Sequence, residues 1–166
     1  MPALASPRVL PLLMAATTPI AIGGLVAMHG TSISPLFAVP AVVFGVTAAT
    51  SPALYIATAA TGAAPPLAAV VRAFGVAIGA FGIALAGLLL PVAFLSLSAV
   101  SGSTTFFVAS AAIAGAGLLG LRRLKDEMHA ARPMSFSGDV VFWIWASATA
   151  GIAGRMWWDL AQEVLS

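Results

Sequence analysis

The sequence predicts an all-α, polytopic membrane helical bundle with five transmembrane helices, and three observations support this prediction. Hydrophobic residues make up 61% of the chain and charged residues only 7%, whereas a soluble domain carries roughly 25% charged residues. The mean hydropathy is +1.07, so lipid rather than water must cover most of the surface. Polar and turn-forming residues divide the chain into five apolar stretches, and one crossing needs about 20 apolar residues.

The first apolar stretch predicts a transmembrane helix over 9–30. It contains Pro11 and Pro19, and membrane helices tolerate proline better than soluble helices do. A cleaved signal peptide is the alternative, because Arg8 precedes the apolar run. We favour a retained helix, because the run is long for a signal peptide and no clear small-x-small cleavage site follows it.

The second and third stretches predict helices over 35–60 and 70–95, joined by a glycine- and proline-containing turn over 61–66. Within the second stretch, Pro52 lacks a backbone donor and its ring clashes with the carbonyl four residues earlier. The sequence therefore predicts a kink over 48–52.

The fourth and fifth stretches predict helices over 104–121 and 140–158, and residues 122–133 between them form the only charged block in the chain. Aromatic residues gather near both ends of the fifth stretch, which is typical of interfacial belts. These aromatic residues are Phe142, Trp143, Trp145, Trp157 and Trp158. No linker is long enough to separate a second domain, so residues 1–166 are predicted to form a single transmembrane domain.

The basic residues predict the orientation, because cytoplasmic loops retain Lys and Arg. Five spans place six basic residues on one side of the membrane and only Arg155 on the other. We therefore expect a cytoplasmic N-terminus and an external C-terminus, in the inner membrane of a bacterium. The basic block is predicted to anchor the cytoplasmic side, and binding of anionic lipid head groups is its alternative role. The six residues are Arg8, Arg72, Arg122, Arg123, Lys125 and Arg132.

Arg155 is the most conspicuous single residue, because it lies within the apolar stretch of the last span. Asp159 follows four positions later, which puts both on one helix face as a candidate intramembrane ion pair. An ionisable residue within a span suggests function. The alternative, which we favour, is an interfacial arginine that extends its side chain toward the membrane surface.

Small residues predict close helix packing. Gly75 and Gly79 form a GxxxG pattern that Gly82 continues, and Gly151 and Gly154 provide a similar surface in the last span. The sequence does not distinguish packing within one chain from packing between chains.

The sequence contains no recognisable catalytic constellation, and we predict neither a metal nor a cofactor. There is no cysteine, and His29 and His129 are predicted on opposite sides of the bilayer, where they cannot share a metal. No basic stripe with interleaved aromatics suggests nucleic acid as a partner. Hydroxyl groups such as those of Thr47, Thr50 and Ser51 could line a polar path, but such groups more often bond to helix carbonyls.

The central region resembles the Yip family of five-span membrane proteins and its bacterial relatives. An apolar span ends in Thr61-Gly62, a short connection leads to a segment over 71–77 that contains a basic residue, and the next apolar run reaches Leu90-Pro91. The resemblance implies a cytosolic N-terminus, five spans and a short tail on the far side. It implies no catalytic residues.

We therefore expect a non-enzymatic integral membrane subunit surrounded by the lipid bilayer. It is predicted to assemble through small-residue helix packing, as a homo-oligomer or in a complex with other membrane proteins. A small oligomeric channel or transporter is the alternative function.

Overall fold

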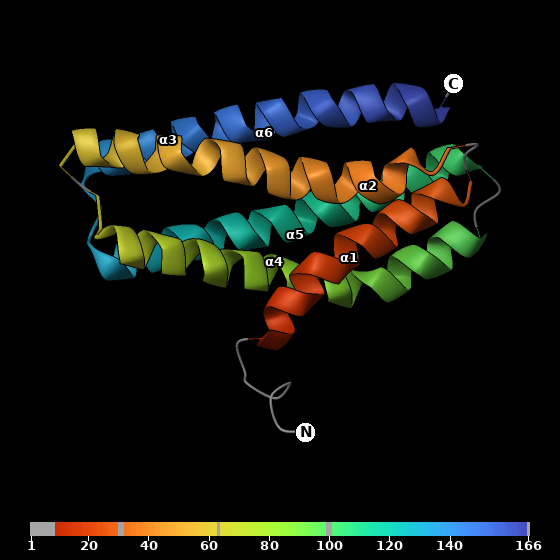
Figure 1. Ribbon diagram of the computed structural model, residues 1–166, viewed down its shortest axis with the longest axis horizontal. Coiled ribbons are helices and arrows are strands. Elements are labelled where there is room, and N and C mark those ends of the chain that lie inside the picture. The colour runs from red at the N-terminus through yellow and green to blue at the C-terminus, as the bar shows by residue number, and fades with distance from the viewer. Residues whose placement is uncertain (1–8, 30–31, 63, 99–100, 166) are drawn as a thin grey trace.

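The computed structural model describes residues 9–29, 32–62, 64–98 and 101–165, and within these ranges it contains helices and no strands (Figure 1). The predicted all-α fold is therefore confirmed. The elements are α1 (Val9–Ala27), α2 (Ser34–Pro40), the π-helical turn η2 (Ala41–Gly45), α3 (Val46–Ala60), α4 (Leu67–Ser98), α5 (Gly102–Ala131) and α6 (Phe136–Leu165).

Five helical segments in the described part of the chain are long and apolar enough to cross a membrane. One of them, Ser34–Ala60, is the continuous run of α2, η2 and α3. The other four are Val9–Ala27, Leu67–Ser98, Gly102–Ala131 and Phe136–Val164. The chain is therefore a multi-pass membrane protein, as predicted.

Residues typical of helix ends mark the turns. Gly62 follows the end of α3 with a φ of 68°, a left-handed conformation that glycine adopts without steric cost. Ser101 precedes α5, and its side chain accepts a hydrogen bond from the backbone N–H of Thr104. Ser135 does the same for Gly138 at the start of α6. Each serine satisfies one of the backbone donors that a helix start leaves free.

The fourth helix is longer than predicted. The span predicted over 104–121 begins at Gly102 and continues through the charged block to Ala131, about 15 Å beyond its predicted end. Arg, Lys, Leu, Met and Glu, which fill much of this block, are good helix formers. An ion pair from Arg123 to Glu127, four residues apart, further supports the extension.

The departure from α-helical geometry lies earlier than the predicted kink over 48–52. The π-helical turn η2, which directly follows Pro40, is this departure. Helix α3, in contrast, runs without interruption through Pro52. Pro52 leaves the carbonyl of Ala48 without its usual N–H partner. The hydroxyl of Ser51 donates to that carbonyl at 3.1 Å, so the lost backbone bond is replaced.

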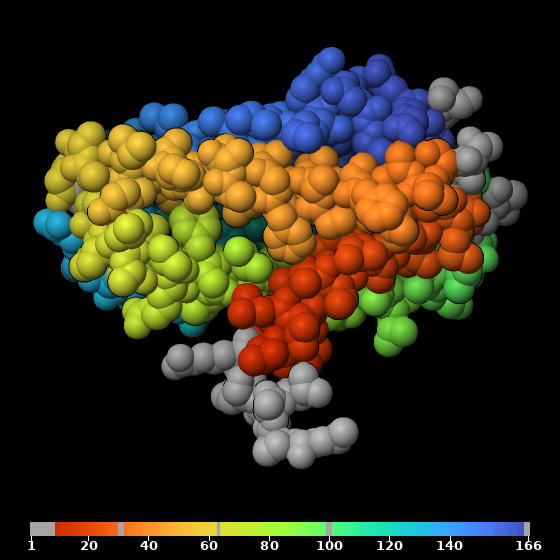
Figure 2. Space-filling model, in the orientation of Figure 1, coloured from red at the N-terminus to blue at the C-terminus, as the bar shows by residue number. Residues whose placement is uncertain are grey.

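Helix α1 crosses α4 obliquely, and two of the predicted packing glycines make the crossing possible (Figures 1 and 2). A Cβ added to Gly82 would lie 2.5 Å from Cα of Ala15, and one added to Gly79 would lie 3.1 Å from Cβ of Pro11. Gly120 of α5 packs closely against the same stretch of α4, beside Ala77 and Phe81. Small residues thus let α1 and α5 approach α4 closely.

Two apolar clusters fill the interior. One joins α1, α2, η2, α4, α5 and the end of α6, and includes Ile22, Val39 and Leu85. The second lies toward the α3–α4 and α5–α6 turns and includes Leu54 and Phe142. No residue of α1 belongs to the second cluster, because α1 is short and covers only part of the length of α4.

Candidate functional site

The acidic residues of α6 indicate how much of this helix the bilayer covers. Asp139 lies in its first turn, and Asp159 lies twenty positions later. This spacing corresponds to a rise of about 30 Å, which matches a hydrocarbon core of about 30 Å. The two carboxylates can therefore occupy the two interfaces while the apolar residues between them remain in lipid.

Arg155 and Asp159 form the predicted pair, with Nη2 of the arginine 3.3 Å from Oδ1 of the aspartate. The two side chains are 75% and 55% exposed, so they lie on the outside of the bundle. Arg155 is one turn deeper than Asp159, and the ion pair directs the guanidinium toward the end of the helix. This geometry agrees with an interfacial arginine that reaches toward the membrane surface.

The remaining predicted packing glycines have no close neighbour among the residues that the structure describes. A Cβ added to Gly75, Gly151 or Gly154 would meet nothing within 4 Å. Their role in helix packing therefore stays a prediction, and it now concerns contacts between chains.

The outer face of α6 is open over its C-terminal half. Gly151 and Gly154 are exposed there, as are Ile152, Met156 and Trp158. Figure 2 shows this half of α6 projecting along one edge of the molecule, beside α2. The chain thus presents small residues flanked by large apolar ones on a surface that none of its described residues covers.

The basic residues predicted as cytoplasmic anchors have different partners. Nη2 of Arg123 lies 2.8 Å from Glu127 Oε1 on the same helix. Arg132 donates from Nη1 to the carbonyl of Ala64 at 3.1 Å, which ties the α5–α6 turn to the α3–α4 turn.

Arg122 differs from these residues. Within the described ranges, it has no carboxylate within ion-pair distance.

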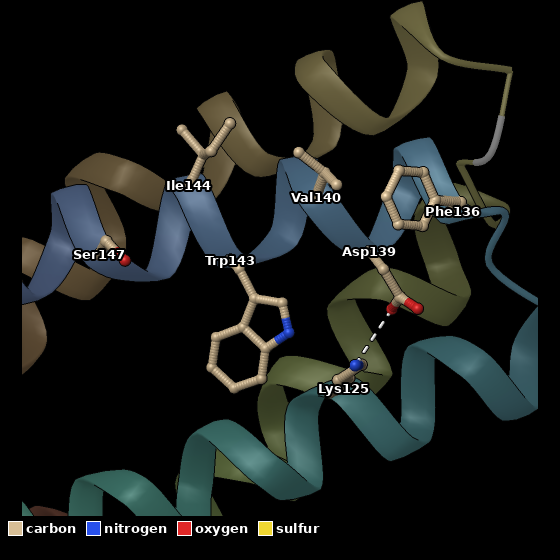
Figure 3. A pocket seen from close by; sticks show the side chains of 7 residues that line it. All are labelled: Lys125, Phe136, Asp139, Val140, Trp143, Ile144 and Ser147. Atoms are coloured by element: carbon tan, nitrogen blue, oxygen red, sulfur yellow. Dashed lines mark ion pairs between the residues drawn. The ribbon is translucent and has the colours of Figure 1, made fainter.

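Lys125, the fourth predicted anchor, connects α5 to α6 beside an open pocket of about 550 Å³. Figure 3 shows Lys125 directed from α5 toward Asp139 and Trp143 on α6. Its Nζ lies 3.1 Å from Asp139 Oδ1, outside hydrogen-bond geometry, and 5.3 Å from the centre of the Trp143 ring. The cation is thus held by both a charge and an aromatic face, in the first turns of α6.

The hydroxyl groups considered for a polar path bond to helix carbonyls. Thr47 donates to Val43 at 2.7 Å and Thr50 to Val46 at 2.9 Å. Ser51 bonds to the carbonyl that Pro52 leaves free. These donors are therefore used within the helix itself, as hydroxyl groups in membrane helices often are.

Two tryptophans hold α6 against its neighbours, and the sequence reasoning missed this role. Trp145 is only 9% exposed, and its indole N–H donates to the carbonyl of Thr50 on α3 at 2.8 Å. Trp157 donates to Ser110 Oγ on α5 at 2.8 Å and stacks on Phe106 at 5.3 Å.

The predicted aromatic belts are therefore wrong in part. Trp143 and Trp158 are exposed at 50% and 58%, as belt residues would be, but Phe142 is fully buried. A buried indole usually finds a hydrogen-bond partner. Ser110, a hydroxyl residue within the fourth span, is the sequence signal for the inward orientation of Trp157. Trp145 bonds to a backbone carbonyl, for which the sequence contains no signal.

The two histidines lie at opposite ends of the bundle. Nδ1 of His29 lies 3.3 Å from the carbonyl of Leu25 near the end of α1. Nδ1 of His129 lies 3.4 Å from the backbone nitrogen of Met134 in the α5–α6 turn. Among the described residues, no three His, Cys, Asp or Glu side chains come together in a group that could hold a metal ion.

No family model, curated protein or solved structure matches this chain. The resemblance to the Yip family therefore stays a prediction.

Proposed function

We propose that this protein is a non-enzymatic integral membrane subunit that assembles through the outer face of α6, with a second copy or with another membrane protein. The observation that carries the proposal is the open space around Gly151 and Gly154. The other glycines of the predicted packing set divide into two groups. Gly79 and Gly82 are used at the α1–α4 crossing, whereas Gly75 has no close neighbour.

The α6 face has the composition of a membrane helix interface. Lipid tails are as apolar as leucine, so helices associate in membranes mainly through close packing and polar contacts rather than through the hydrophobic effect. Glycines allow the backbones to approach, and Ile152 and Met156 beside them can pack into the partner. Arg155 and Asp159 lie on the exposed surface of the same helix, where they can add polar contacts.

We favour this subunit over the alternative, a channel or transporter, because of the hydroxyl groups on α3. Thr47, Thr50 and Ser51 donate to helix carbonyls, and Thr50 also accepts a hydrogen bond from Thr149 of α6 at 3.2 Å. A path for water or ions needs such groups to face an opening. Here all three bond to carbonyls of their own helical run, and Thr50 also joins α3 to α6.

Native mass spectrometry of the protein extracted gently from its own membrane tests the proposal. The wild-type chain should run as a defined homo-oligomer or as a stable complex with another membrane protein. Gly154→Leu should weaken this assembly by about tenfold, because an added side chain at a close-packed interface costs about 1–3 kcal/mol.

Gly87→Leu is the matched control, because Gly87 is also exposed in a membrane helix and a Cβ there meets nothing within 4 Å. It should leave assembly unchanged. A wild-type protein that is strictly monomeric in its own membrane, or equal behaviour of the two variants, would refute assembly through α6.

We further propose that the protein lies in the inner membrane of a bacterium with its N-terminus in the cytoplasm. This orientation is supported by the basic residues at the α3–α4 and α5–α6 ends of the bundle. The chain has no native cysteine, so Ser103→Cys and Ser137→Cys can each be labelled alone with an impermeant thiol reagent. The cysteine at 103 should react from outside and the cysteine at 137 only after permeabilisation. The reverse pattern would invert the topology.

A further inference from the structure

A groove between α4 and α5 combines apolar walls with charged residues at one end. The apolar part is lined by Ala80, Ile83 and Ala84 of α4 and by Leu119 of α5. Arg122, Arg123 and Asp126 of α5 stand at its mouth. The groove has a volume of about 520 Å³, within the range of small-molecule sites. Ile83 and Leu119 are 52% and 51% exposed, so the groove opens on the outer surface of the bundle.

The level of the groove in the bundle places its mouth among lipid head groups. Lys125 pairs with Asp139, the residue that marks one interface on α6. Arg122 precedes Lys125 by three positions, or about 4.5 Å along α5. Phe81 of α4 packs beside Gly120, which is already deeper along α5 than Arg122. Because α4 runs antiparallel to α5, Ile83 lies deeper in the bilayer than Phe81. The apolar walls therefore extend from the interface toward the bilayer centre.

The two charges at the mouth that are unpaired among the described residues, on Arg122 and Asp126, lie at different depths in the membrane. The positive Arg122 is nearer the bilayer centre, and the negative Asp126 is one turn farther out, about 6 Å along the helix. They are spaced four residues apart but form no ion pair with each other, and no other charged residue in the described ranges pairs with either. Arg123 also lines the groove, but its charge is balanced by its ion pair with Glu127. The groove therefore has almost no net charge, with its positive end inward and its negative end outward.

We propose that this groove binds one phospholipid with a zwitterionic, ammonium-bearing head group. In such a lipid the phosphate is nearer the acyl chains and the ammonium is farther out, which matches the order of Arg122 and Asp126. A guanidinium binds phosphate oxygens through charge-assisted hydrogen bonds, and the carboxylate holds the ammonium. One acyl chain lies along Ile83 and Leu119. An anionic head group fits less well, because Asp126 repels it.

Native mass spectrometry with an equimolar mixture of phosphatidylethanolamine, phosphatidylglycerol and phosphatidylcholine tests this proposal. The wild-type protein should retain one zwitterionic lipid about fivefold better than phosphatidylglycerol, because one charge near the membrane surface contributes about a fivefold change in binding. Asp126→Asn should remove this preference. Arg122→Gln should lower retention of all three lipids by about fivefold.

Two further variants separate the groove from general surface charge. Ile83→Trp fills the apolar part without changing any charge, and it should lower retention of all three lipids. Arg72→Gln removes a basic residue that does not line the groove, and it should change nothing. Soluble phosphoethanolamine, which lacks acyl chains, should not displace the bound lipid. Circular dichroism verifies that each variant keeps its helices.

Three results would overturn the proposal. One is a wild-type protein that retains phosphatidylglycerol at least as well as the zwitterionic lipids. Another is equal behaviour of Arg122→Gln and Arg72→Gln. The third is displacement of the lipid by soluble phosphoethanolamine, which would show that the apolar walls of the groove contribute nothing to binding. None of these results depends on whether α6 mediates assembly.

Discussion

The crossing of α1 and α4 at Gly82 can be tested by adding a single methyl group. In Gly82→Ala the new Cβ would lie 2.5 Å from Cα and 2.7 Å from Cβ of Ala15. Carbon atoms prefer separations of about 3.5–4.0 Å, so α1 and α4 must move apart by about 1 Å. Overpacking of this kind costs about 1–3 kcal/mol. Alanine also favours a helix over glycine by about 1 kcal/mol, which partly masks this cost.

Gly87→Ala isolates the packing cost from the helix propensity. Gly87 is on the same helix, and an added Cβ there meets nothing within 4 Å. We expect Gly87→Ala to be neutral or stabilising by up to about 1 kcal/mol. The free energy of unfolding of Gly82→Ala should then be lower than that of Gly87→Ala by about 1–3 kcal/mol.

Reversible unfolding in mixed micelles, with increasing fractions of a denaturing detergent and detection by tryptophan fluorescence, measures this difference. Both variants should retain the helix content of the wild-type protein. Equal stabilities for Gly82→Ala and Gly87→Ala would mean that α1 does not contact α4 at this point, and the described crossing would be wrong.

The same unfolding assay tests two contacts of α6 and α3. Trp157→Phe removes the hydrogen bond to Ser110 while keeping an aromatic ring, and it should cost about 0.6 kcal/mol, the average for such bonds in membranes. Trp158→Phe, at an exposed position, should cost less, and equal losses would argue against the bond. Ser51→Ala should cost about 1 kcal/mol, because it leaves a carbonyl without a partner. In a Pro52→Ala background, where the backbone N–H returns, the same change should cost much less. An undiminished cost there would disprove the replacement bond.

The sequence predicts the number of spans because lipid imposes a strong local rule. Each crossing needs an apolar helix of a fixed minimum length, and the five stretches satisfy this rule without reference to one another. The helix ends are less predictable. The extension of α5 to Ala131 depends on helix formers and on contacts of Arg123 and Lys125 that no apolar window detects.

The pairing of helices is where prediction from one sequence fails. Gly79 and Gly151 belong to similar small-residue patterns, yet only Gly79 packs against another helix within the chain. Likewise, Trp145 and Trp143 are two positions apart, but one is buried against α3 and the other is exposed. The hydropathy of a span is the same whichever of its faces packs against another helix. The rotation of each helix, which decides these contacts, depends on the whole set of neighbours.

The α1–α4 crossing also has a consequence for the order in which the protein is assembled during synthesis. Gly82 is synthesised 67 positions after Ala15, which takes about 3–13 s at a rate of about 5–20 residues per second. Of the helices that α1 contacts in the folded chain, only α2 has been made during this delay, and Gly23 packs there against the backbone of Pro35. The first two spans can therefore form a hairpin before α4 is made, with the α4-facing side of α1 still uncovered. That face is completed only when α4 leaves the insertion machinery.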